Sequence, residues 1–172
     1  MNKEKRQKKH RRGGTTIVMI GIIMAMMLFL LVFLETQTIY DCQYHVQASA
    51  QRAVNMTVED AMDDEWRKDG YNYMDVDAAK RKLISNLRDC LNLNTANTST
   101  DAEGRELYKC EFENIKYSSG QDPSHPQAGI ELDMTITYYS DVGKHFNVPT
   151  ITWTNKLKSS NFRTDDDLRA GH

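Results

Sequence analysis

The sequence predicts an α+β protein with a long N-terminal helix that starts in a membrane, a second amphipathic helix and a small antiparallel three-stranded β-meander. Three observations support this fold class. An uncharged apolar run, Ile17 to Leu34, is long enough to span a bilayer. Apolar residues recur at helical spacing in the middle of the chain and alternate with polar residues in the last third. The 172 residues therefore suffice for one membrane segment and one modest domain.

The apolar run is preceded by a dense basic leader. As a helix, residues 17–34 measure roughly 27 Å, close to the thickness of the bilayer hydrocarbon core. The first 14 residues carry seven basic side chains and one acidic, so the net charge of -2 leaves about -8 on the remainder. The topology signal consists of Lys8, Lys9, Arg11 and Arg12. The positive-inside rule places this leader in the cytoplasm, with the acidic remainder outside, where we expect no nucleic-acid binding.

These features divide the chain into four parts. Residues 1–14 are the cytoplasmic basic leader, and residues 15–35 are the transmembrane helix. Residues 36–163 form an extracytoplasmic α+β domain, and residues 164–172 are a flexible acidic tail. The apolar run is longer than the core of a cleavable secretory signal, so we expect an anchor that signal peptidase leaves intact.

The first helix is predicted to continue beyond the membrane, because Thr36 to about Trp66 contains no proline or glycine. Gly70 ends it, and Asp75 is a suitable N-cap for the second helix. The second helix has a clear apolar face, comprising Val76, Ala79, Leu83, Leu87, Cys90 and Leu91. A polar loop is predicted from Asn92 to Gly104.

The last third of the chain has the two-residue period of half-buried strands. The first strand is indicated by Tyr108, Cys110 and Phe112, and a loop follows from Ser118 to Gly129. The second strand has the strictest alternation, with Ile130, Leu132, Met134, Ile136 and Tyr138 on one face. After a turn at residues 141–143, the third strand carries Ile151, Trp153 and Leu157. Short links between consecutive strands predict an antiparallel meander.

Three cysteines lie on the predicted outer side, where one pair and one leftover thiol is the simplest arrangement. Cys90 and Cys110 are both predicted to face the core, which favours a disulfide between them worth roughly 3 kcal/mol in the chain-entropy model. The alternative is two buried thiols. Cys42 is then unpaired or forms an intermolecular bridge.

The sequence contains no assembled catalytic or metal-binding motif. The outer histidines, His45, His125, His145 and His172, lack the paired spacing of a metal site. The acidic runs at 60–65 and 165–167 lack the pattern of a calcium loop. Cys42 and His45 have no accompanying oxyanion site. We therefore expect no enzyme, no metal and no cofactor.

The order of a basic leader, an apolar helix and a small sheet resembles that of type IV pilin-like proteins. The leader ends in Arg11-Arg12-Gly13-Gly14, and Gln47 to Val54 is similar to the Gln/Ala/Arg-rich helix of TadE-like minor pseudopilins of tight-adherence pili. The resemblance implies a pilin-like fold and leader cleavage between Gly14 and Thr15 by a prepilin peptidase. The family usually has glutamate five residues after the cut, where this chain has Met19, which favours a minor subunit over a major pilin.

The resemblance implies a non-enzymatic minor pilin-like or pseudopilin-like subunit that assembles through its hydrophobic N-terminal helix into a surface pilus or secretion-type filament. Its partners would be membrane lipid, other pilin-like subunits or pilus-assembly proteins. The alternative is an uncleaved single-pass membrane protein whose extracytoplasmic domain is a structural subunit of an envelope complex. Both alternatives place the protein in the cell membrane with the N-terminus inside.

Overall fold

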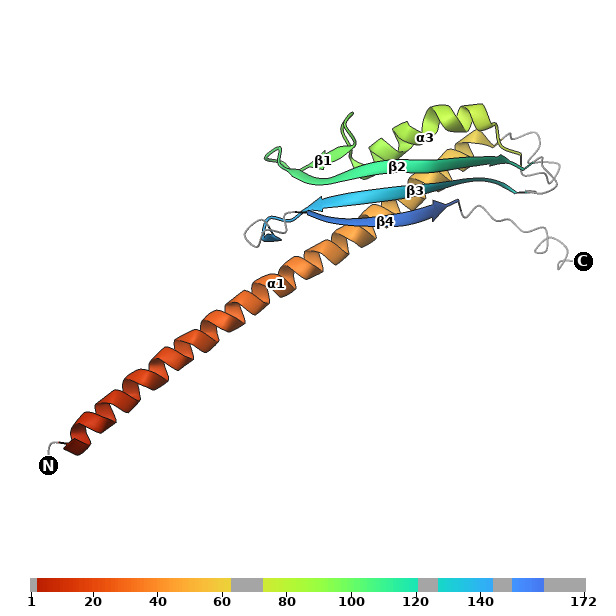
Figure 1. Cartoon of the computed structure of the whole chain (residues 1–172). Helices are drawn as coiled ribbons and strands as arrows, with labels where there is room; N and C mark the ends of the chain where they lie inside the picture. Colours follow the sequence, from red (N-terminus) through yellow and green to blue (C-terminus); the bar gives the residue numbers. More distant parts are fainter. Residues whose placement is uncertain (1–2, 63–72, 121–126, 144–149, 160–172) are drawn as a thin grey trace, which may run out of the picture. The chain divides into compact units, whose positions relative to one another are not determined.

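The computed structural model describes residues 3–62, 73–120, 127–143 and 150–159, with side chains from residue 14 onward. The chain divides into two compact units, Met1–Asp41 and Cys42–His172. The described elements in chain order are α1 (Lys3–Ala61), α3 (Val76–Leu91), β1 (Thr98–Thr100), β2 (Glu106–Ser119), β3 (Ala128–Tyr139) and β4 (Thr150–Lys158) (Figure 1). The predicted α+β class and the order of its two helices and three long strands are confirmed.

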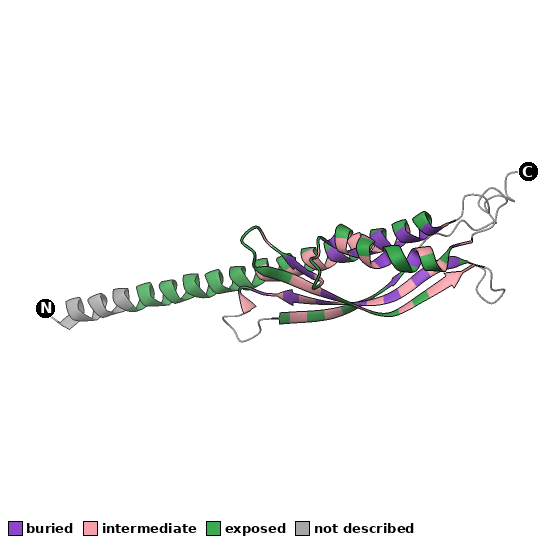
Figure 2. Ribbon diagram, turned by 90° about the horizontal axis from the view of Figure 1, so that it is seen from above, coloured by how far each residue is buried: buried purple, intermediate pink, exposed green. Residues whose placement is uncertain are grey.

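The first unit contains the apolar part of α1. Every residue from Gly14 to Leu34 is exposed, and this stretch is green throughout in Figure 2. Within the described residues, α1 is the one helix that is long and apolar enough to cross a membrane. The stretch contains no proline, so no residue in it removes a main-chain hydrogen bond of the helix.

In the second unit, α1 contributes a stripe of small side chains to the core. The fully or nearly fully buried residues are Val46, Ala50, Ala53, Val54, Thr57, Val58 and Ala61. Thr57 is the polar member of this stripe, and its hydroxyl donates to the Ala53 carbonyl oxygen at 2.8 Å. Thr57 Oγ1 in turn accepts a 2.9 Å hydrogen bond from Asn86 Nδ2 of α3. This hydroxyl is therefore satisfied, as burial requires.

Helix α3 begins and ends as its sequence predicts. Asp75 is the N-cap, and its Oδ1 accepts from the backbone N–H groups of Asp77 and Ala78 at 2.9 and 3.1 Å. Asn92 closes the helix in the left-handed conformation, which asparagine tolerates well. The buried positions are Ala79, Leu83, Leu87 and Leu91, four residues apart.

Main-chain hydrogen bonds connect the ends of three elements within the second unit. The Asp75 N–H donates to the Ala61 carbonyl at the end of α1, at 2.9 Å. The Met74 N–H donates to the Ser119 carbonyl at the end of β2, at 3.0 Å. The C-terminal end of α1, the start of α3 and the end of β2 therefore meet at one end of the domain.

The sheet is antiparallel with the order β1-β2-β3-β4, so the predicted three-strand meander gains a fourth strand (Figure 1). The additional strand, β1, lies inside the stretch from Asn92 to Gly104 that was predicted as loop. Its three residues are too few to give an alternation, and their polar side chains are typical of a turn. Thr98 and Ser99 are nevertheless buried.

The central strand β3 alternates strictly between buried and half-buried residues, as Figure 2 shows in purple and pink. Its buried side chains are Ala128, Ile130, Leu132, Met134, Ile136 and Tyr138. They form one core with the buried residues of α1 and α3, together with Cys110 and Leu157. One face of the sheet therefore carries both helices, as the alternating pattern predicts for a two-layer domain.

Strand β2 contains a bulge that preserves its buried face. The register with β3 shifts between Glu113 and Lys116, and Asn114 has a positive φ of 52°. Before the bulge, Phe112 pairs with Met134, and after it Tyr117 pairs with Ile130. The extra residue changes the inward positions from even to odd numbers, which is why the sequence alternation ends at Phe112.

Some predictions fall outside the described residues. The predicted continuation of the first helix toward Trp66 is one, since α1 ends at Ala61 and residues 63–72 are not described. The acidic tail at 164–172 is another.

Candidate functional site

The candidate processing site lies within α1. Gly14 and Thr15 are both exposed, and a Cβ built on Gly14 would meet no atom within 4 Å. A side chain at position 14 is therefore compatible with the fold. The predicted topology residues, Lys8, Lys9, Arg11 and Arg12, belong to the part of α1 described by its backbone alone.

The three cysteines, Cys42, Cys90 and Cys110, are free thiols, so the predicted disulfide between Cys90 and Cys110 is not formed. The buried residues of α3 are Ala79, Leu83, Leu87 and Leu91, and Cys90 packs against the same core without being enclosed by it. Cys90 is half-buried, whereas Cys110 is fully buried on β2.

The environment of Cys110 keeps its thiol protonated. Burial raises the pKa of Cys110 to about 12, and the nearby Cys42 thiol adds to the shift. Burial also raises the pKa of Cys42. A cysteine nucleophile needs a lowered pKa, so neither thiol has the character of a catalytic group.

Tyr108 lies two residues before Cys110 on β2 and packs against the same core. Its hydroxyl donates to the Leu91 carbonyl oxygen at 2.7 Å, which satisfies one of the last carbonyls of α3. Burial raises the pKa of Tyr108. The residue therefore connects β2 to the end of α3.

The predicted absence of a histidine site concerns mostly positions outside the described residues, namely His125, His145 and His172. His45 is exposed, and its ring meets the edge of Tyr44 at 5.9 Å between centroids. Across the described ranges, no group of three or more His, Cys, Asp or Glu side chains could hold a metal ion.

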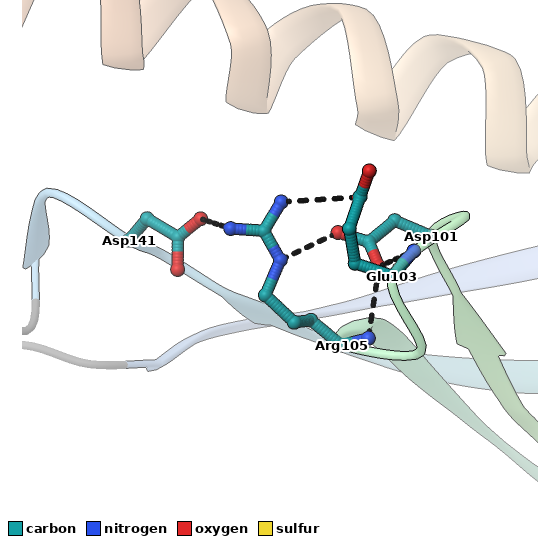
Figure 3. Close-up of polar contacts among 4 residues, drawn as sticks. All are labelled: Asp101, Glu103, Arg105 and Asp141. Carbon is teal, nitrogen blue, oxygen red and sulfur yellow. Dashed lines mark hydrogen bonds and ion pairs between the residues drawn. The ribbon is translucent and has the colours of Figure 1, made fainter.

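A cluster of charges that sequence reasoning missed surrounds Arg105 (Figure 3). Arg105 Nε donates to Asp101 Oδ2 at 2.7 Å, while its two terminal nitrogens lie 3.5 Å from Glu103 Oε2 and 3.9 Å from Asp141 Oδ2. Asp101 Oδ1 also accepts from the backbone N–H groups of Glu103 and Arg105, at 3.0 and 2.8 Å. These hydrogen bonds lower the pKa of Asp101, the backbone bond from Arg105 contributing most.

The Arg105 cluster has a structural explanation. The sequence Asp101 to Arg105 makes a tight turn in which Gly104 has a φ of 79°, a conformation that glycine adopts freely. The guanidinium then connects this turn between β1 and β2 to Asp141, just after β3 (Figure 3). Three carboxylates lie near this one guanidinium, so the net negative charge of the cluster disfavours an anionic ligand.

The sheet face opposite the helices is polar. Threonine hydroxyls of β3 and β4 form two cross-strand hydrogen bonds, Thr135 with Thr154 at 3.0 Å and Thr137 with Thr152 at 3.4 Å. Lys158 and Glu131 form an ion pair of 2.7 Å, which lowers the pKa of Glu131. This face has the composition of a solvated surface.

Strand β4 is an edge strand of the described sheet, and α1 reaches part of that edge. Gln51 Nε2 donates to the Lys158 carbonyl oxygen at 2.7 Å. Two buried side-chain nitrogens of β4, Trp153 Nε1 and Asn155 Nδ2, have no hydrogen-bond partner among the described residues. This strand therefore contains the least satisfied polar groups of the described core.

No family model, no curated protein and no solved structure matches this chain.

Proposed function

We propose that this protein is a non-enzymatic, single-pass membrane subunit of the minor pilin or pseudopilin type, similar to TadE-like proteins. Its basic leader stays in the cytoplasm, and its α+β domain lies outside the cytoplasm. A prepilin peptidase removes residues 1–14, and the mature chain begins at Thr15. The hydrophobic part of α1 then assembles with other pilin-like subunits in a surface pilus or a secretion-type filament.

The observation that carries this proposal is the dual character of α1. One continuous helix, Lys3–Ala61, has a fully exposed apolar stretch in the first unit and a stripe of small buried residues in the second. Each large apolar side chain gains about 1.5 to 3 kcal/mol when it leaves water, so a stretch of this length requires lipid or protein around it. A helix that can exchange lipid contacts for protein contacts suits a subunit that is stored in a bilayer and later assembled.

The distribution of charge supports the orientation. The leader carries seven basic side chains, whereas the first Lys or Arg after the apolar stretch is Arg52. This difference favours a cytoplasmic N-terminus.

The experiment that tests the proposal measures leader processing in three matched chains: wild type, Gly14→Leu and Gly21→Leu. Each is expressed in membranes that contain a prepilin peptidase, and the N-terminus is determined by intact mass. A Cβ at Gly14 or at Gly21 meets no atom within 4 Å, so leucine fits the helix equally well at both positions. We expect the wild type and Gly21→Leu to begin at Thr15, and Gly14→Leu to retain its leader.

An intact leader on all three chains would contradict the pilin-type assignment. It would leave the alternative of an uncleaved membrane protein whose outer domain is a structural subunit of an envelope complex. Loss of the leader from Gly14→Leu as well would show that processing does not depend on Gly14, which also contradicts the proposal.

A further inference from the structure

Tyr40 is an exposed aromatic side chain on the segment of α1 that follows the apolar stretch. Its exposed fraction is 63%. Tyr44, one helical turn later, is 72% exposed. Tyrosine has an apolar ring and a polar hydroxyl, so it favours the boundary between hydrocarbon and water.

Helix geometry separates the two tyrosines by depth. If residues 15–34 fill a hydrocarbon core of about 30 Å, the Cα of Tyr40 lies roughly 9 Å beyond Leu34, and that of Tyr44 roughly 15 Å beyond it. Side chains on a helix lean toward its N-terminus, so each ring lies several ångströms closer to the core than its Cα. The headgroup layer on one side is about 5 to 8 Å thick. The Tyr40 ring therefore falls inside this layer, and the Tyr44 ring falls beyond it.

Two threonines between Leu34 and Tyr40 have hydroxyl groups that suit a partly dehydrated layer. Thr36 Oγ1 donates to the Val32 carbonyl oxygen at 2.8 Å, and Thr38 Oγ1 donates to the Leu34 carbonyl oxygen at 3.0 Å. These hydroxyls are thus satisfied by the helix itself and do not require water. A polar group with an internal partner enters a membrane interface at much lower cost.

We infer that Tyr40 binds the headgroup layer of the outer leaflet and fixes the depth of α1 in the membrane. The acidic residues Glu35 and Asp41 flank the site, and the nearest following Lys or Arg is Arg52. Anionic lipids therefore gain no attraction here, and the partner is a zwitterionic phospholipid surface. This inference rests on the membrane insertion in the proposed function, but not on leader cleavage or filament assembly.

Depth-dependent fluorescence quenching tests the inference on the full chain in phosphatidylcholine vesicles. Tryptophan is introduced singly as Met24→Trp, Tyr40→Trp or Tyr44→Trp, and the wild type provides the background of the two native tryptophans. Phosphatidylcholine brominated near the top or near the end of the acyl chains serves as the quencher. We expect shallow bromines to quench the added signal of Tyr40→Trp at least twofold more than that of Tyr44→Trp. Deep bromines should quench Met24→Trp most strongly.

Each departure from this pattern has a distinct meaning. If Met24→Trp is quenched while Tyr40→Trp and Tyr44→Trp respond equally, the helix is inserted and the role of Tyr40 is refuted. If Met24→Trp is not quenched at either depth, membrane insertion fails, and with it both this inference and the proposed function. The same quenching is measured in phosphatidylglycerol vesicles. If shallow bromines quench Tyr40→Trp twofold more strongly there than in phosphatidylcholine vesicles, the choice of a zwitterionic partner is overturned.

Discussion

Raising the pH above about 9 should destabilise the folded chain through Cys110, a fully buried thiol. The pKa of this thiol rises from 9.0 to about 12 on folding because burial disfavours the thiolate. Below pH 9 both the folded and the unfolded chain keep the proton, so the full stability is present. Between pH 9 and pH 12 only the unfolded chain releases it, and stability falls by about 1.4 kcal/mol per pH unit.

Integrated from pH 8 to pH 11, the contribution of Cys110 to the loss is about 2 to 3 kcal/mol. The assay is urea unfolding in detergent solution at several pH values, followed by tryptophan fluorescence, for the wild type and Cys110→Ala. Cys42 and Tyr108 have pKa values raised by burial and contribute in the same direction, but they are present in both chains. The difference between the two pH profiles therefore reports Cys110 together with its coulombic effect on Tyr108. Parallel profiles from pH 8 to pH 11 would refute the assignment of a strongly raised pKa to this thiol.

Two further predictions concern local structure and use the same unfolding assay at pH 7. Asp75→Ala should cost about 1 kcal/mol because two backbone N–H groups of α3 lose their acceptor, whereas the exposed control Asp89→Ala should stay within about 0.5 kcal/mol. Equal losses of stability in Asp75→Ala and Asp89→Ala would argue against a stabilising N-cap at Asp75. Asn114→Val should cost about 1 to 2 kcal/mol more than Asn114→Gly, because the φ of 52° suits glycine and strains a β-branched residue. Similar midpoints for these two variants would show that the bulge relaxes without strain.

The sequence predicted those elements that have a strong and continuous period. Strand β3 has a perfect alternation from Ala128 to Tyr139, and it is the clearest strand of the structure. Asp75 is followed by a regular apolar stripe, so the start of α3 could be placed at the correct residue. In these elements the local preferences and the core packing agree, and pattern reasoning then works well.

The features that sequence reasoning missed depend on contacts between distant residues. Strand β1 is defined by its pairing with β2, for example Thr98 with Lys109, and not by a pattern of its own. The Cys90–Cys110 disulfide was wrongly predicted because two side chains that contact the same core need not lie at bonding distance. The Arg105 cluster was missed because Asp141 approaches only after the chain has folded.

The measurement that tests the central claim most directly is the intact mass of the wild-type protein purified from its native membrane. Our account predicts a mature chain that begins at Thr15, without the seven basic side chains of the leader. A mass that includes residues 1–14 would contradict the pilin-type assignment.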